Sequence, residues 1–202
     1  MSLTPVAAEQ LAAVVTMLEM HAFPADMALP PSPLRLDRRL AIAPNEYRTL
    51  FRLVGAPWLW FSRLVMSDTD LCAIVHDDSV ELFAVVDAAN QDVGMLELDF
   101  RTANECELAF LGLVPALAGH GHGRWLLAEA ITRAWRPDVT RVHVHTCTLD
   151  HPAALAAYRC AGFTAIGRAI EQFADPRLAG VLPLDCASHI PLLRTQAATA
   201  TR

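Results

Sequence analysis

The stretch VPALAGHGHGRWLL (residues 114–127) carries glycine at three alternate positions, Gly119, Gly121 and Gly123. It stands between a strand-like run and a run of apolar residues with helical spacing. Glycine weakens a helix by roughly 0.5–1 kcal/mol relative to alanine, so a requirement other than stability must explain it. A loop that leaves a strand and enters a helix presents free N–H groups at the positive end of the helix dipole. The stretch therefore predicts a loop that binds an anion, most commonly phosphate.

Two common phosphate-binding motifs do not fit this loop. A P-loop requires a lysine after its glycines, and none follows Gly123. A dinucleotide-binding fingerprint requires a third glycine, but that position holds Arg124 when counted from Gly119 and Leu126 when counted from Gly121. Arg124 is placed to add a charge-assisted hydrogen bond to a bound phosphate. A flexible connector without a ligand is the remaining alternative.

The sequence around the loop predicts a mixed α/β domain. Helices are expected at 7–20, at 44–55, after a cap near Ser67, directly after the glycine loop, and at 151–163. Strands are expected at 34–42, 80–86, 93–100, 106–114, 141–147 and 164–173. Prolines between residues 24 and 33 predict an extended linker after the first helix.

Composition excludes several classes of protein. The chain has 202 residues, of which 53% are apolar and 19% charged, so it can bury a sizeable core and is unlike a disordered chain. A formal net charge of −6 argues against nucleic-acid binding. No apolar run is long enough to span a bilayer and no start resembles a signal peptide, so no membrane association is expected. The five cysteines are scattered and form no C-x-x-C pair, which predicts free thiols and a cytoplasmic location.

Two stretches resemble the signatures of the GCN5-related N-acetyltransferase (GNAT) family. The glycine loop is similar to its pyrophosphate-binding segment, V-x-P followed by [QR]-x-x-G-x-[GA], and the matching residues are Val114, Pro115, Gly121 and Gly123. The stretch HPAALAAYRCAGF (residues 151–163) resembles the family's N-x-x-A-x-x-x-Y-x-x-x-G-F, with matches at Ala154, Tyr158, Gly162 and Phe163. The chain departs at Ala118, where the family has Arg or Gln, and at His151, where it has Asn.

The resemblance implies a fold. It is a central mixed, mostly antiparallel sheet flanked by helices and splayed between the fourth and fifth predicted strands, 106–114 and 141–147. The expected organisation is an N-terminal helix and Pro-rich linker (1–33), an acetyltransferase domain (34–175) and a C-terminal tail (176–202). The two flanking segments pack on the domain, cover the acceptor site or join two copies in a homodimer, and the sequence does not choose among these.

The resemblance also implies acetyl-CoA as co-substrate and direct attack by an amine in a ternary complex. Backbone groups of Leu113 and Val114 would meet the pantetheine arm, including the N–H that polarises the thioester carbonyl. The residues expected to bind the coenzyme are Leu113, Val114, Ala118, Gly119, His120, Gly121, His122, Gly123, Arg124, His151 and Ala154.

Tyr158 stands where the family carries its acid, a tyrosine that faces the coenzyme sulfur. A phenol with a pKa near 10 keeps its proton at neutral pH and can donate it. From the residues alone the alternative is a tyrosine that packs one face of a helix, since Leu155 lies three residues before it.

Glu107 is the first candidate for the catalytic base, on a strand where the family often places one. Strand alternation predicts that Glu107 shares a face with Ala109, Leu111 and Leu113. Glu97 is the second candidate, with Met95 and Asp99 on its face. The alternative for either carboxylate is a solvated position on a strand.

Alternation also places His143, His145 and Cys147 on one face of a strand, which raises the possibility of a zinc site. Metal sites usually draw ligands from several elements, so no metal is expected and half-buried strand histidines near the acceptor pocket are favoured.

Trp58, Trp60 and Arg63 fall where family members place acceptor-binding helices, together with Phe61. The aromatics would shape a pocket and Arg63 would hold an acidic group of the substrate, although core packing explains the tryptophans equally well. The predicted function is an acetyl-CoA-dependent N-acetyltransferase for a small amine or amino-acid-like acceptor, with a protein N-terminus second. The alternative is a non-catalytic acyl-CoA-binding sensor or interaction module.

Overall fold

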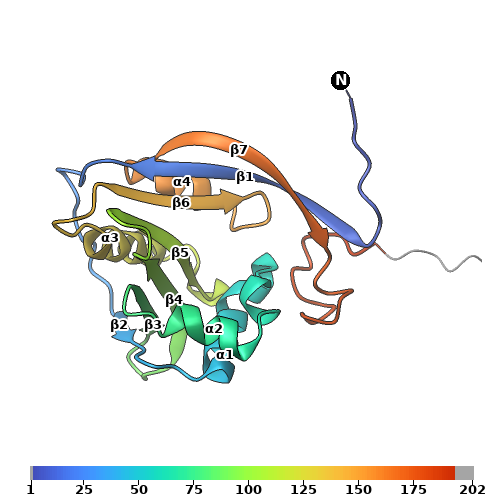
Figure 1. The fold of residues 1–202 in the computed structure, drawn as a ribbon, viewed down its shortest axis with the longest axis horizontal. Coiled ribbons are helices and arrows are strands. Elements are labelled where there is room, and N and C mark those ends of the chain that lie inside the picture. Colours follow the sequence, from blue (N-terminus) through green and yellow to red (C-terminus); the bar gives the residue numbers. More distant parts are fainter. Residues whose placement is uncertain (1, 194–202) are drawn as a thin grey trace, which may run out of the picture.

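The computed structural model describes residues 2–193 and builds them around one seven-stranded sheet with the order β2-β3-β4-β5-β6-β1-β7 (Figure 1). The strands are β1 (Gln10–Met20), β2 (Arg35–Arg38), β3 (Val80–Val86), β4 (Asp92–Asp99), β5 (Glu105–Leu113), β6 (Arg141–Cys147) and β7 (Thr164–Ala174). Among the strands of residues 2–193 only β5 and β6 pair in parallel, so the predicted mixed, mostly antiparallel sheet is confirmed.

Helices flank the sheet where they were expected from α1 onward. They are α1 (Pro44–Gly55), α2 (Asp68–Val75), α3 (His122–Ala134) and α4 (Ala154–Cys160), with short 3-10 turns η1 (Ala56–Trp58), η2 (Ser62–Leu64) and η3 (Pro115–Leu117). The Ser67 hydroxyl caps α2 by accepting a hydrogen bond from the Asp70 N–H at 3.1 Å, as the sequence predicts. Among the described residues no helix is long and apolar enough to cross a membrane.

The helix expected over residues 7–20 is wrong, because this segment is the strand β1. Its Ala, Leu and Glu favour a helix by propensity, but the sheet leaves a place between β6 and β7 that β1 fills, antiparallel to both. The central run Val14-Val15-Thr16 is β-branched and suits that place. The predicted boundary at residue 34 therefore does not separate β1 from the sheet.

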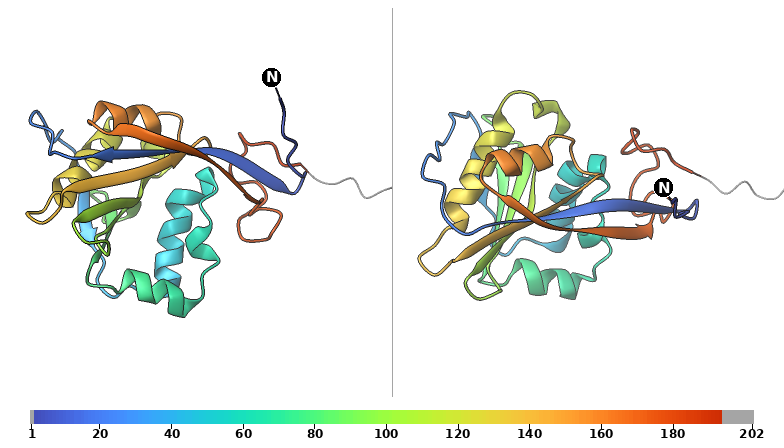
Figure 2. Two further views of the ribbon diagram at one scale, coloured as in Figure 1. Left: turned by 45° about the horizontal axis from the view of Figure 1, so that its top comes forward. Right: turned by 90° about the horizontal axis from the view of Figure 1, so that it is seen from above.

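The sheet opens between β5 and β6, as predicted for the fourth and fifth expected strands. The two strands pair only from Glu105–Glu107 to Arg141–His143, although they continue to Leu113 and Cys147. Beyond the paired residues the two strands diverge and leave a gap between them (Figure 2).

A β-bulge changes which residues of β5 share a face. Leu98 lies opposite Leu108 and Glu97 lies opposite Phe110, so Ala109 is an extra residue in β5. Glu107 therefore shares its face with Phe110 and not, as simple alternation predicts, with Leu111 and Leu113.

Two separate cores lie on the two faces of the sheet. Alternate residues of β4 divide between them, with Leu96 and Leu98 in the core under α3 and α4, and Met95 in the core under α1 and α2. The largest buried side chains of the first core include Leu126 and Ile131 of α3, and those of the second include Tyr47 and Phe51 of α1. Strands β3, β4 and β5 are thus packed on both faces.

Candidate active site

A cavity of about 750 Å³ lies where β5 and β6 separate. Its walls come from the glycine loop and the start of α3, from α4, from β5 and the end of β6, and from an aromatic end. The aromatic end is formed by Trp58 and Phe61 of the η1–η2 segment and by Phe173 of β7.

Most of the residues predicted to act at the site meet in this cavity. Those that line it are Trp58, Trp60, Arg63, Glu107, Leu113, Val114, Ala118, Gly119, Gly121, Gly123, Arg124, His151, Ala154 and Tyr158. Glu97, His120 and His122 do not line it. The sequence reasoning did not single out Asp150, Glu171 and Phe173, which also line the cavity.

The glycine loop has the geometry that the sequence predicts for an anion site. Gly119 and Gly121 have φ of +80° and +82°, a conformation that residues with a Cβ rarely adopt, and Gly121 is the N-cap of α3. A Cβ built on Gly119, Gly121 or Gly123 meets no atom within 4 Å, so the loop is open to a ligand. The N–H groups of His122 and Gly123, the first two of α3, have no acceptor one turn before them in the helix, whereas the Arg124 N–H donates to the Gly121 carbonyl at 3.0 Å.

His122 ties this loop to the N-terminal segment rather than lining the cavity. Its Nδ1 lies 3.2 Å from the Ser32 hydroxyl. The His120 ring is stacked with that of His122 at 6.2 Å between centroids. The side chains of the two histidines thus lie outside the cavity, and only their backbones belong to the glycine loop.

The free edge of β5 supplies backbone groups to the cavity. The Val114 N–H donates to the Val93 carbonyl at 2.9 Å. It is therefore not available to a ligand, whereas the sequence predicted that it could meet the pantetheine arm. Because hydrogen-bonding alternates along an antiparallel ladder, the backbone groups of Leu113 and Leu111 point to the other edge, toward the gap. Leu113 is therefore the donor that the geometry offers.

Tyr158 of α4 is 8% exposed and packs edge-on against Phe163, with 5.8 Å between ring centroids. Burial raises the pKa of its phenol above the ordinary value, and the charge of Asp150 acts in the same direction. The hydroxyl in the cavity is therefore protonated over the whole physiological range.

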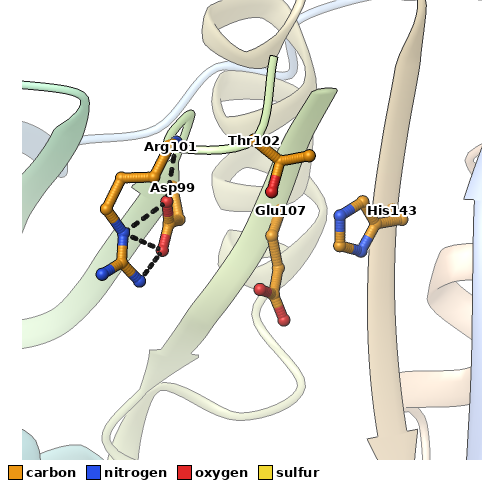
Figure 3. Close-up of a pocket in the computed structure, with 5 residues that line it drawn as sticks. All are labelled: Asp99, Arg101, Thr102, Glu107 and His143. Carbon is orange, nitrogen blue, oxygen red and sulfur yellow. Dashed lines mark hydrogen bonds and ion pairs between the residues drawn. The ribbon is translucent and has the colours of Figure 1, made fainter. Parts of the chain in front are cut away.

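Glu107 of β5 faces two histidines of the neighbouring strand β6. His145 Nδ1 is 3.4 Å from a Glu107 carboxylate oxygen, and Figure 3 shows His143 beside Glu107 in an adjoining cavity of about 240 Å³. The hydrogen bond with His145 lowers the pKa of Glu107, burial opposes this, and the charges of both histidines add to the lowering. The same hydrogen bond raises the pKa of His145. Glu107 is thus an ionised carboxylate at neutral pH.

The strand face with His143, His145 and Cys147 is organised by hydrogen bonds and burial. His145 is engaged with Glu107, and burial raises the pKa of the Cys147 thiol to about 11, which keeps it protonated. Among residues 2–193, no group of three or more His, Cys, Asp or Glu side chains is arranged to hold a metal ion.

Glu97, the second candidate base, lies outside the cavity. It is fully buried and accepts hydrogen bonds of 2.6 Å from the Tyr47 hydroxyl and from Arg63 Nη2. Its two oxygens are therefore committed to the core beneath α1. Arg63 lines the cavity, but its charge is neutralised by Glu97, so it is a poor candidate for the acidic-substrate role expected from the sequence.

Replacing Arg63 with Met is expected to lower the free energy of unfolding by about 3–5 kcal/mol, because the buried Glu97 carboxylate would lose its cation. Urea denaturation measures this. The matched control is Arg101→Met, which breaks the pair of Asp99 with a guanidinium that is 40% exposed and should cost less than about 1 kcal/mol. Equal losses of unfolding free energy in the two variants would contradict the conclusion that Arg63 neutralises the buried Glu97.

Asp150 connects the two sides of the cavity. It accepts hydrogen bonds from the Trp60 Nε1–H at 3.1 Å, the Thr146 hydroxyl at 2.9 Å and the Cys147 N–H at 2.8 Å. An aspartate just after a strand is a turn signal, which could have drawn attention to this residue. Its bond to Trp60, 90 residues away, could not be read from the sequence.

His151 occupies the position of the family's asparagine. Its Nδ1 accepts a hydrogen bond from the Ala153 N–H at 3.1 Å, so it shapes the turn into α4. Its ring also contacts Trp58 edge-on, with 5.1 Å between centroids. The residues expected to bind coenzyme and acceptor therefore touch one another here.

Comparison with known proteins gives a consistent result. The family model described as "Acetyltransferase (GNAT) family" matches residues 47–163, more than half of the chain. No curated protein sequence matches the chain significantly.

Solved structures with the same fold share little sequence with this chain. A GCN5-related N-acetyltransferase from Sphaerobacter thermophilus has a TM-score of 0.58 at 15% identity over 80% of this chain and 51% of its own. An aminoglycoside acetyltransferase, meta-AAC0020, from an uncultured soil metagenomic sample has a TM-score of 0.54 at 17% identity, over 69% of this chain and 93% of its own. The spermidine/spermine N-acetyltransferase SpeG from Vibrio cholerae has a TM-score of 0.52 at 18% identity, over 74% of this chain and 98% of its own. This chain spans only 51%, 63% and 52% of the first three structures that it matches.

Proposed function

The chain belongs to the GNAT acetyltransferase family, and from this we propose that it transfers an acetyl group from acetyl-CoA to a primary amine in a ternary complex. The proposed acceptor is a small molecule or an amino-acid-like compound. We place the reaction in the cytoplasm because all five cysteines are free thiols.

One observation carries the proposal. A single cavity joins an open glycine loop at a helix N-terminus to a protonated tyrosine and an ionised carboxylate. An anion site, an acid and a base are the three parts that amine acetylation needs from a protein.

The residues present fit acetyl-CoA. Gly119, Gly121 and Gly123 leave room for a diphosphate beside the first N–H groups of α3, and the exposed Arg124 guanidinium can reach its oxygens. With Ala118 the loop lacks the Arg or Gln side chain that the family has there, and the backbone N–H groups would bind the diphosphate in its place. Leu113, at the free edge of β5, would donate its N–H to the thioester carbonyl.

The proposed chemistry divides between Glu107 and Tyr158. When bound, acetyl-CoA supplies the thioester whose carbonyl carbon bonds to the amine nitrogen as the C–S bond breaks. Glu107, directly or through one water, takes the proton that the ammonium must lose. The Tyr158 hydroxyl gives a proton to the departing thiolate sulfur. The nitrogen loses its second proton to solvent as it becomes an amide, and Tyr158 regains a proton from solvent.

Charges around the cavity favour an amine acceptor. Two of the three arginines that line the cavity, Arg63 and Arg101, are paired with Glu97 and Asp99. Two proteins with the same fold are named for acetylating aminoglycosides and spermidine or spermine, which supports a small amine as the acceptor class.

The test measures the release of the coenzyme thiol when a panel of primary amines is incubated with acetyl-CoA and either the wild type or Glu107→Gln. At least one amine should be acetylated, and the variant should lose roughly 10²–10³-fold in kcat/KM. Because the pKa of Glu107 is lowered, the ratio of wild type to variant should stay constant from about pH 9 down to about pH 5. A ratio that falls toward one already at neutral pH would exclude Glu107 as the base. Binding of acetyl-CoA without turnover of any amine would favour a sensor instead.

A further inference from the structure

The segment after β7 turns back and is fastened by one buried arginine. Arg177 is 3% exposed, and its Nε and Nη2 donate to the Asp175 carboxylate at 3.0 and 2.7 Å. Its Nη1 donates to the Ile190 carbonyl at 2.9 Å and to the Ala187 carbonyl at 3.4 Å. A buried guanidinium thus fixes the backbone of residues 186–190 against the end of β7. Residues 175–190 are called the strap below.

The strap packs on the η1–η2 segment through Leu59. Leu182 and Ala187 of the strap form a small buried cluster with Leu59, which is 2% exposed. Leu59 has φ +58°, a left-handed conformation that costs a residue with a side chain about 1–3 kcal/mol. Burial of the leucine side chain against the strap offsets that cost and holds the turn.

The turn at Leu59 carries the aromatic end of the cavity. Trp58, the residue before it, contacts His189 of the strap on one side and His151 on the other, with ring centroids 5.7 and 5.1 Å apart. Phe61, two residues after it, packs on Phe173 at 5.0 Å. The strap does not line the cavity itself, so it acts on the cavity by fixing the residues that do.

We propose that Arg177 is a positioning residue for acceptor recognition, which sets the place of Trp58 and Phe61 by fastening the strap behind them. The assignment rests on the proposed function, in that the aromatic end receives the acceptor amine. Among the contacts of the described residues, none joins the strap to the glycine loop or to α3, so the coenzyme's diphosphate is expected to bind independently of the strap.

The first test separates acceptor from coenzyme. Arg177→Met is expected to raise KM for the amine roughly tenfold, since a small displacement of a binding wall has effects of this size, and to leave the acetyl-CoA dissociation constant unchanged. Arg177→Lys should recover part of the loss, because one donor to the strap remains. Arg168→Met, on the exposed face of β7, is the matched control and should match wild type. Equal changes in amine KM and acetyl-CoA affinity would overturn the assignment.

A milder variant covers the case in which Arg177→Met does not fold. His189→Ala removes only the edge contact with Trp58 and should raise KM for the amine about threefold, with kcat preserved. An unchanged KM would show that the strap does not position the aromatic end.

A second readout does not depend on turnover. Hydrogen–deuterium exchange of the peptide covering residues 56–62 should be faster than in the wild type in Arg177→Met, because the turn at Leu59 is released. It should be faster to a lesser degree in His189→Ala, because Trp58 loses one contact. Unchanged exchange would overturn the proposal that the strap positions the aromatic end, even if no amine is ever acetylated. Faster exchange with no acetylated amine would instead place the failure in the proposed function.

Discussion

Replacing Tyr158 with phenylalanine is expected to lower kcat roughly 10²–10⁴-fold while leaving acetyl-CoA affinity within about twofold. The substitution removes one oxygen and keeps the ring that packs against Phe163. Burial raises the pKa of Tyr158, so the wild-type rate should show no loss from tyrosine ionisation up to about pH 10. Steady-state rates and calorimetric binding measure the two effects.

The chain contains one other tyrosine, Tyr47, which makes the control unusually close. Tyr47→Phe removes a hydroxyl that donates to buried Glu97, so it should cost stability and leave kcat nearly unchanged. Similar kcat losses in the two variants would mean that Tyr158 acts through the fold and not as an acid.

The second large effect is expected at the glycine loop. Gly121→Glu should weaken acetyl-CoA binding more than roughly 100-fold, because it puts bulk and a like charge beside the expected diphosphate. Calorimetry measures it directly. The site has open space around Gly121, so the loss would arise from the ligand and not from a clash within the protein.

Gly180→Glu is the matched control. Gly180 also has a positive φ, +73°, and open space around it, but it lies in the strap and not in the loop. The added charge is therefore the same in the two variants and the backbone strain is similar. Equal weakening in both, or no effect of Gly121→Glu, would remove the loop as the coenzyme site.

Local signals predicted most of the fold because they coincide with what tertiary packing requires. The cap at Ser67 and the strand ranges 80–86 and 141–147 were read from a few residues and are confirmed. The segment 7–20 failed because its helix-forming composition was overruled by an open place in the sheet that only the complete chain creates.

The candidate site was predictable in its motifs and not in its long-range contacts. Glycine spacing and the Tyr158 motif are local, and both reach the cavity. The bulge at Ala109 shifts strand alternation by one residue, so the face shared with Glu107 was wrong beyond that point. The hydrogen bond from Tyr47 to Glu97 joins residues 50 positions apart, and that from Trp60 to Asp150 joins residues 90 positions apart. No local sequence pattern predicts either bond.

The position of β1 has a consequence for synthesis of the protein. β1 (Gln10–Met20) is the first strand of this sheet to leave the ribosome, yet its two neighbours are β6 and β7, the last two strands of the sheet to be made. At about 5–20 residues per second, roughly 8–30 s pass between the emergence of β1 and that of β7. During that interval β2–β5 can assemble as a nascent half-sheet, whereas β1 waits as an unpaired apolar segment within reach of chaperones. The outer half of the sheet therefore closes late, and the N-terminal strand is inserted near the end of folding.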